Sequence, residues 1–576
     1  MKVQQILPQI QNNNYKEKKQ QNPAQPNFGN AYAAITTGLR FLDTNQAWGA
    51  NAVDLCSMVI PRTTVDMVNR GPDAGMETAR RESSGTINHS LVGLYGTLGG
   101  IMLAGALNSK FGVKAQKMFV DDDTLKTLGD TWTAQVKSGS KDTLNDYLQT
   151  VFKNAQTRVG DEWKNIPQEN IDDIVGKFTE TLKNKENAPI TITKDLKEYA
   201  QSVITHVTGS ENGFRLTKES QPTTLSNMLD GIYNVTRAFS AKEINVDEFL
   251  KSMQKMNRNR ALIGLGIASA VGMSIQPLNI YLTKKKTGSD GFVGVEGREK
   301  DKSGGFKIMK ALAAAGFMTI SLATIGFKGG VSGIMKKLQY KGLNPTLDQY
   351  KFIYGMTIMS RFMSARDKDE LRESAVKDTL GFFNWLILGN FVAKMVANSM
   401  DQNLLNYSEK EHGKGFFNKI FKAPMATRDE VLHRGLKACG IDSVENGKAL
   451  SFKTLLKKLD DARVSEAVRK ETKGKLRALS IAQVAGYLYS GIILGFGIPK
   501  LNIYMTNKSE AKRKAKLAAE KAKQGENAQA AQQNIQQAVG TKADTNVEAK
   551  QTEVATTPAQ AQYTAMNKPD MKELLK

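Results

Sequence analysis

Apolar residues gather in five runs along this chain, and long charged segments separate these runs. The runs cover residues 90–107, 261–283, 311–327, 380–397 and 478–506. Each reaches the lower end of the roughly 17–25 residues that a helix needs to cross a bilayer. The third run is short, and the fourth is interrupted by polar side chains. This pattern predicts a multi-pass helical membrane protein.

Small residues recur inside the runs at a spacing of four, which places them along one face of a helix. The glycines at this spacing are Gly96 and Gly100, Gly264 and Gly272 with Ala268 between them, and Gly491 and Gly495. Such stripes let two helices approach closely in a membrane, whereas glycine weakens a helix in water by about 1 kcal/mol. The alternative is a large soluble helical protein whose core helices are rich in glycine.

The segments between the runs are charged and carry apolar residues at i, i+3 and i+4, with Asp at expected N-caps. They predict soluble helical inserts over 110–256 and 401–477. The strongest strand signal is the sequence PITIT at 189–193. One such signal leaves the predicted class all-α.

Both ends of the chain are polar. Residues 1–30 are rich in Gln, Asn and Lys and predict a disordered leader without a cleavable signal peptide. Residues 511–576 are basic and then of low complexity, which predicts a disordered tail. The predicted location is therefore an inner or plasma membrane, reached through internal spans.

Four short motifs occur twice in the same order. LNIYLT begins at residue 278 and LNIYMT at 501, and RAL opens the apolar run before each. Earlier, MVIPR at 58–62 resembles MTIMSR at 356–361, and RRES at 80–83 resembles LRES at 371–374. The order predicts two repeated halves, 40–290 and 331–510, joined by 291–330 with a short span at 311–327. Chance similarity between helices of similar composition is the alternative.

Each LNIY motif follows a proline and precedes lysines. Tyrosine and lysine at the end of an apolar run are typical of the membrane interface. We therefore predict interface anchors at Tyr281, Lys284, Lys285, Tyr504 and Lys508. The number of spans between the halves leaves their relative orientation open.

The chain has 80 Lys and Arg against 57 Asp and Glu, a net charge of +23. This excess favours anionic lipid headgroups as partners, with a second copy or another membrane protein as further candidates. Nucleic acid is disfavoured because the basic segments lack interleaved aromatic residues. The sequence does not identify a small-molecule substrate. Two cysteines exclude a disulfide framework.

The most distinctive polar block lies at 59–90, immediately before the first run. Its candidate polar or ion-pair residues are Arg62, Asp66, Arg70, Glu82 and His89. The first three recur every four residues and can pair along one helix face. The block predicts either an ion path or headgroup site, or an interfacial helix whose ion pairs are solvated.

Four further polar residues fall inside apolar runs: Asn384, Asn390, Lys394 and Gln483. In a membrane they would line a substrate site or hydrogen-bond between helices, and Lys394 would reach the interface by snorkelling.

No catalytic motif, metal site or cofactor site appears in the sequence. The segment 241–253 lacks the oxygen ligands of a calcium loop, and His433 and Cys439 lack partners at zinc spacing. Three hypotheses remain: a transporter- or channel-like protein with a site between the halves, a non-catalytic membrane scaffold, and an interface enzyme using the 62–89 block.

Overall fold

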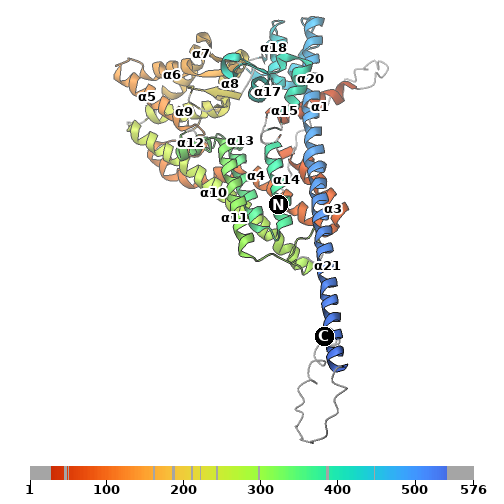
Figure 1. Ribbon diagram of the computed structural model, residues 1–576. Helices are drawn as coiled ribbons and strands as arrows, with labels where there is room; N and C mark the ends of the chain where they lie inside the picture. The colour runs from red at the N-terminus through yellow and green to blue at the C-terminus, as the bar shows by residue number, and fades with distance from the viewer. Residues whose placement is uncertain are drawn as a thin grey trace, which may run out of the picture. The chain divides into compact units, whose positions relative to one another are not determined.

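The computed structural model describes residues 28–44, 49, 51–52, 54–159, 162–183, 188–208, 212–218, 220, 222–241, 244–295, 299–327, 329–384, 388, 390–445 and 448–540. The chain divides into two compact units, Met1–Asn507 and Lys508–Lys576. Helices dominate the described residues (Figure 1), which confirms the predicted all-α class. Most of the predicted leader and the end of the tail lie outside the described residues.

The first part of the chain forms α1 (Phe28–Thr44), the π-helical η1 (Asp54–Val59), α3 (Ile60–Arg70), α4 (Pro72–Phe111), η2 (Ala115–Lys117), α5 (Asp122–Lys137), α6 (Thr143–Asn154), β1 (Gln156–Val159), β2 (Glu162–Asn165), α7 (Gln168–Lys183), α8 (Lys194–Thr208), β3 (Asn212–Arg215), β4 (Thr223–Thr224), α9 (Leu225–Ala241) and α10 (Val246–Thr287).

The second part forms α11 (Gly304–Ile325), α12 (Gly330–Lys337), α13 (Leu347–Ser364), α14 (Lys368–Phe382), α15 (Phe391–Met400), η4 (Gln402–Leu404), α16 (Glu409–His412), α17 (Phe416–Lys422), α18 (Arg428–Lys437), β5 (Val444–Glu445), β6 (Lys448–Ala449), α19 (Phe452–Lys458), α20 (Glu466–Ser490), the π-helical η5 (Gly491–Gly497) and α21 (Ile498–Gly540).

Four helical segments of the described chain are long and apolar enough to cross a membrane: α4, α10, α11 and the continuous helix Glu466–Asn534. They contain the first, second and fifth predicted runs, and α11 contains the third run up to Ile325. Side-chain caps define where several of them begin, since Asn245, Ser303 and Ser465 accept a hydrogen bond from the first turn of α10, α11 and α20.

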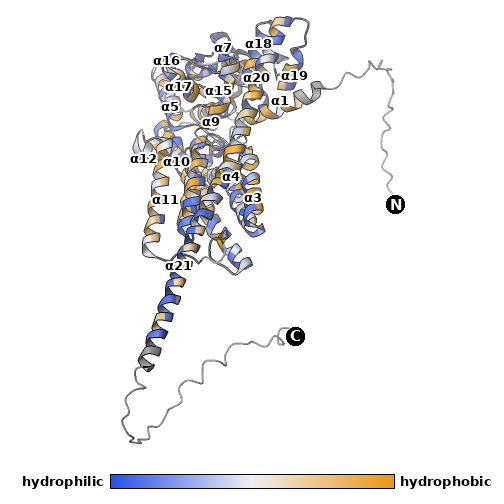
Figure 2. Ribbon diagram, turned by 45° about the vertical axis from the view of Figure 1, so that its right-hand side comes forward, coloured by the Kyte–Doolittle hydropathy of each residue, from blue (hydrophilic) through white to orange (hydrophobic). Residues whose placement is uncertain are grey.

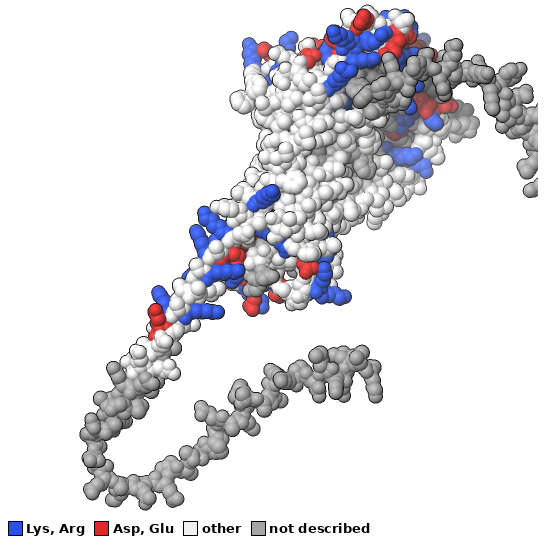
Figure 3. Space-filling view, turned by 90° about the vertical axis from the view of Figure 1, so that its right-hand side faces the viewer, with Lys and Arg blue, Asp and Glu red and all other residues white. Residues whose placement is uncertain are grey.

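Large hydrophobic side chains remain exposed along these helices, which is unusual for a protein surrounded by water. They include Ile87, Leu94, Leu98, Ile101 and Met102 on α4, Leu262 and Leu278 on α10, Leu312 on α11, and Leu488 and Ile492 on α20 and η5. Figure 2 shows hydrophobic residues along α4 and α11. In Figure 3 charged side chains gather at the upper end of the face in view, and the middle of that face is almost free of them.

The fourth apolar run differs from its prediction. Residues 380–397 do not form one helix, because α14 ends at Phe382 and α15 begins at Phe391. The Leu388 amide donates to the Phe383 carbonyl at 2.7 Å, a wider spacing than the α-helical one. Neither short helix has the length of a span.

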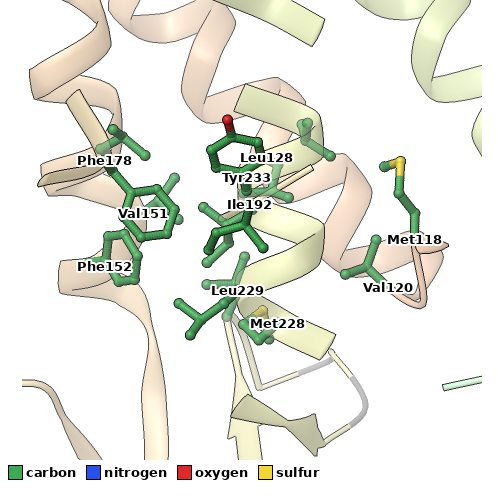
Figure 4. Packing of buried hydrophobic residues seen from close by; sticks show 14 of the residues in the cluster. Met118, Val120, Leu128, Val151, Phe152, Phe178, Ile192, Met228, Leu229 and Tyr233 are labelled. Carbon is green, nitrogen blue, oxygen red and sulfur yellow. The ribbon is translucent and has the colours of Figure 1, made fainter. Parts of the chain in front are cut away.

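The segment between α4 and α10 folds around its own hydrophobic core. Figure 4 shows Val151, Phe152, Phe178, Leu229 and Tyr233 packed together from α6, α7 and α9. Burial raises the pKa of Tyr233 to about 12, so its hydroxyl stays protonated and donates to the Pro189 carbonyl. A four-stranded antiparallel sheet, ordered β2-β1-β3-β4, covers this core.

The predicted strand at 189–193 is wrong, because these residues form a loop whose Ile192 enters the core. The six strands that form in the described residues are two to four residues long, too short for an alternating pattern to reveal them in the sequence.

The segment between α15 and α20 is smaller. Its helices α18 and α19 share a core with α15 and α20, formed by residues such as Leu432, Leu436, Leu459 and Leu476. The hairpin of β5 and β6 lies against α8 of the first insert. The two inserts therefore touch each other.

The second unit is helical from Lys508 to the end of α21 at Gly540, and its side chains are mostly exposed. The part of the predicted tail from 511 to 540 is thus helical. Residues 541–576 lie outside the described residues.

Candidate functional site

The helices α4 and α10 pack antiparallel along nearly their whole length. At one end Lys110 pairs with Glu248, and at the other the Lys286 ammonium lies 2.6 Å from the Asp73 carboxylate. These two helices form the first hairpin of the bundle, with the larger insert at its closed end.

Predicted packing glycines lie where α4 and α10 cross. A Cβ added to Gly264 would lie 2.8 Å from the Gly96 Cα and 2.5 Å from the Tyr340 hydroxyl oxygen. Gly100 lies against Arg260, whose guanidinium donates to two backbone carbonyls. The helices approach this closely only because both Gly96 and Gly264 lack side chains.

A second antiparallel hairpin joins α14 and α15 to the helix running from α20 into α21. A Cβ at Gly486 would lie 3.1 Å from the Ala393 Cβ, and the Asn502 amide donates to the Glu373 carbonyl at 3.1 Å. The smaller insert lies at the closed end of this hairpin.

Glycines also allow close contacts between the two hairpins and the helices that precede them. A Cβ at Gly272 would lie 2.7 Å from the Thr357 hydroxyl on α13, and one at Gly495 would lie 2.6 Å from the Ser57 carbonyl on η1. Gly491 is packed less closely, since a Cβ added there would lie 3.8 Å from the Ser57 hydroxyl. In the first hairpin, α10 thus packs against α13, which precedes the second hairpin. In the second hairpin, η5 packs against η1, which precedes the first hairpin.

The two copies of LNIY-x-T make equivalent hydrogen bonds. The Asn279 side chain donates to the Glu77 carbonyl at 2.9 Å, as Asn502 does to the Glu373 carbonyl. The Thr283 hydroxyl accepts from an arginine of α4, and the Thr506 hydroxyl accepts from an arginine of α14.

Two reciprocal ion pairs join the beginnings of the hairpins. Arg366, just before α14, lies 2.6 Å from Glu77 on α4, and Arg70, just before α4, donates to Glu373 on α14 at 2.9 Å. The Phe292 ring lies 5.5 Å from the Arg70 guanidinium and 5.8 Å from that of Arg366. The helices α4 and α14 therefore begin at the same end of the bundle, and both inserts lie at the opposite end.

A buried charge cluster lies one to two turns deeper. The Glu82 carboxylate is surrounded by four cationic groups, at 3.6 Å for Arg62, 3.3 Å for Arg81, 3.3 Å for Arg361 and 3.2 Å for Lys377. All five side chains are at least nine-tenths buried. Burying charges is costly unless they are paired, so their mutual attraction holds this cluster together.

A second carboxylate completes the cluster on the other hairpin. Asp378 on α14 lies 2.8 Å from Arg361 and is fully buried. A Cβ at Gly381 would lie 3.4 Å from Arg62, and one at Gly85 would lie 3.6 Å from Arg361. Arg62 on α3 therefore faces a glycine of α14, and Arg361 on α13 faces a glycine of α4.

A pocket that is partly open to solvent lies between the two hairpins beside this cluster. Its lining residues are Arg62, Asp66, Arg70, Ala74, Glu77, Thr78, Arg81, Phe292, Val293, Gly294, Glu373, Lys377, Pro499 and Asn502. Three residues of the polar block predicted from the sequence, Arg62, Asp66 and Arg70, thus line one pocket. They are buried or nearly so, and their ion pairs are not the solvated pairs of the alternative interpretation.

His89 lies apart from the pocket lining. It is buried on α4, with its ring 5.4 Å from the Tyr354 ring and 6.0 Å from the Tyr350 ring. Its neighbours are aromatic, which favours a packing role.

The predicted intramembrane polar residues do not meet in one place. Asn384 is buried and Asn390 is exposed, while the half-buried Lys394 donates to the Phe421 carbonyl at 3.4 Å. Gln483 donates to the Tyr487 hydroxyl at 2.9 Å. None of them lines the pocket.

The predicted interface residues are exposed, as a position in contact with lipid or headgroups requires. Tyr281 and Tyr504 are 61% and 62% exposed, and Lys284, Lys285 and Lys508 are exposed as well.

The sequence interpretation missed more than half of the site: Glu77, Arg81, Arg361, Arg366, Glu373, Lys377 and Asp378. A signal was present, because a shift of 296 positions aligns 70–88 with 366–384 without a gap. The shift matches Arg70, Asp73, Glu77, Ala79, Gly85 and Asn88 to Arg366, Asp369, Glu373, Ala375, Gly381 and Asn384. The reciprocal ion pairs and the Asn279 and Asn502 hydrogen bonds follow this register, which differs by five positions from the RRES and LRES match. The arginines that donate to Thr283 and Thr506, Arg80 and Arg372, do not follow it.

Within the described residues, no group of three or more His, Cys, Asp or Glu is arranged to hold a metal ion. Comparison with known proteins finds no matching protein family, no matching curated protein and no matching solved structure.

Proposed function

We propose that this chain is a multi-pass membrane protein built from two duplicated halves, located in an inner or plasma membrane. The four apolar helices and their exposed hydrophobic side chains support membrane insertion. The register of 296 positions and the reciprocal ion pairs support the duplication. Equivalent contacts at equivalent positions are not expected from chance similarity of composition.

In this proposal the halves share one orientation. Both inserts lie on one side of the membrane, and the basic loop after α10 lies on the other. This loop and its flanks contain Lys284, Lys285, Lys286, Lys300 and Lys302. By the positive-inside rule the loop side is cytoplasmic. Anionic lipid headgroups are the proposed partners of its exposed lysines.

We further propose a transporter- or channel-like activity at the interface between the halves. The observation that carries this proposal is the buried charge cluster around Glu82, which both halves build and which adjoins the pocket. Ionisable residues at membrane depth are costly and usually serve an ion or solute path. A non-catalytic scaffold that displays the joined inserts is the alternative function.

The proposal is tested by charge movement across reconstituted vesicles on a solid-supported membrane. Concentration jumps of chloride and of inorganic phosphate are expected to produce currents with the wild type. The Lys377→Gln variant, which changes a cation of the pocket, is expected to lose most of this current. The exposed Lys286→Gln is the matched control. Absence of any current from correctly inserted wild type would contradict transport and leave the scaffold function.

A further inference from the structure

Arg62 is a buried cation whose hydrogen-bonding capacity is only partly used. Its Nε donates to the Leu494 carbonyl at 3.1 Å, which fixes the guanidinium between α3 and η5. The side chain is 1% exposed, yet neither Nη1 nor Nη2 has a hydrogen-bond partner. The nearest ion-pair partner, Glu82, is 3.6 Å from Nη1, beyond hydrogen-bond distance. Leaving such donors unsatisfied costs free energy.

A second unsatisfied group lies in the wall of the same pocket. The Asn502 side chain donates through Nδ2 to the Glu373 carbonyl, while its buried Oδ1 has no partner. The pocket wall also contains Arg81 and Lys377, whose charges share the single Glu82 carboxylate with Arg62. This wall therefore offers unused donors, one unused acceptor and a local concentration of positive charge.

The charged residues that line the pocket are four cations, Arg62, Arg70, Arg81 and Lys377, and three carboxylates, Asp66, Glu77 and Glu373. Asp66 and Glu373 pair with Arg70, and Glu77 pairs with Arg366. The lining carboxylates are therefore engaged by other arginines, whereas Arg62, Arg81 and Lys377 share the Glu82 carboxylate.

We propose that this pocket binds a phosphate group, with Arg62 as the principal ligand. A guanidinium presents paired N–H groups that match two oxygens of an oxyanion. A phosphate that keeps one proton also carries an O–H, which can donate to Asn502 Oδ1, whereas a carboxylate carries none. This inference rests on the proposed function of the same site and names the class of its ligand.

The phosphate group has two sources, a free phosphate in water or a lipid headgroup. The pocket lies near the end of the bundle that carries the LNIY motifs, since its wall includes Pro499 and Asn502 and residues of the loop after α10. The exposed tyrosines of these motifs mark the level at which headgroups lie. Both sources therefore have access, and the experiment separates them.

Binding is measured on the purified full-length protein by equilibrium dialysis with labelled inorganic phosphate, with chloride held constant. Nanodiscs of phosphatidylcholine, with and without phosphatidic acid, test the lipid source through thermal unfolding. The Arg62→Gln variant is expected to weaken phosphate binding at least about tenfold, a loss typical of a charge-assisted hydrogen bond. The exposed Lys286→Gln is expected to bind as the wild type does.

A matched pair of glycine variants covers the case in which Arg62→Gln does not fold. Gly381→Ala places a methyl group 3.4 Å from Arg62 Nη2, and Gly85→Ala places one 3.6 Å from Arg361 Nη2, without changing any charge. Because Arg361 already donates to Asp378 and Glu82, only Gly381→Ala is expected to weaken phosphate binding.

The outcomes are distinct. Phosphate binding that Gly381→Ala or Arg62→Gln weakens supports a site for free phosphate. An effect of phosphatidic acid alone, lost in the same variants, supports a headgroup. Binding that no pocket variant affects, or no binding at all, overturns the inference. Currents without phosphate binding would overturn the inference and keep the proposed function. Phosphate binding without currents would keep the phosphate site and contradict the proposed transport.

Discussion

Replacing Glu82 with Gln is expected to lower the free energy of unfolding by about 3–5 kcal/mol, the usual cost of removing one partner of a buried ion pair. Among the described residues, Glu82 is the only carboxylate within ion-pair distance of Arg62, Arg81 and Lys377. The amide keeps the shape of the side chain but leaves these cations to repel one another. Thermal unfolding of the purified protein in detergent measures the loss.

Glu248→Gln is the matched control for this variant. Glu248 also pairs with a lysine, Lys110, but both side chains are 51% exposed. Its loss is expected to cost less than about 1 kcal/mol. Adding Lys377→Gln to Glu82→Gln should restore part of the stability, because it relieves the repulsion. Equal unfolding temperatures for Glu82→Gln and wild type would contradict the cluster as described.

Replacing Gly264 with Ala is expected to destabilise the protein by about 1–3 kcal/mol, the usual effect of overpacking a tight contact. The new methyl would lie 2.8 Å from the Gly96 backbone and 2.5 Å from the Tyr340 hydroxyl. The backbone of α4 cannot yield as a flexible side chain would, so α4 and α10 must separate. Thermal unfolding again measures the effect.

The control is Gly266→Ala, two residues away on α10, where an added Cβ meets no atom within 4 Å. Alanine is the better helix former by about 1 kcal/mol, so this variant should be neutral or more stable. If the two variants behaved alike, the close crossing of α4 and α10 would be contradicted.

The apolar helices could be predicted because each run has one simple pattern. Length and hydrophobicity locate α4, α10, α11 and the helix that begins with α20. Residues 380–397 have a similar average character, and the polar Asn384 and Asn390 that interrupt them do not by themselves mark the end of α14 at Phe382. Whether a helix continues there depends on its packing partners, which a local pattern does not contain.

Only part of the candidate site could be predicted, because its residues come from segments that lie far apart in the sequence. Arg62, Asp66 and Arg70 were found because they recur along one helix. Glu373, which pairs with Arg70, and Lys377, which pairs with Glu82, lie on α14, about 300 positions away in the sequence. Only the shift of 296 positions relates the two segments in the sequence. The RRES and LRES match implies a shift of 291 positions, in which Glu82 corresponds to Glu373 and not to Asp378.

Membrane insertion with both halves in one orientation is tested most directly by cysteine accessibility. Cys56 and Cys439 are first replaced by Ala, and single cysteines are placed at Lys137, Lys453 and Lys285, which are all exposed. Sealed vesicles are then labelled with a membrane-impermeant maleimide. We expect labelling at Lys137 and Lys453 from one side and at Lys285 only from the other. Labelling of Lys137 and Lys453 from opposite sides, or of all three from the same side, would contradict this topology.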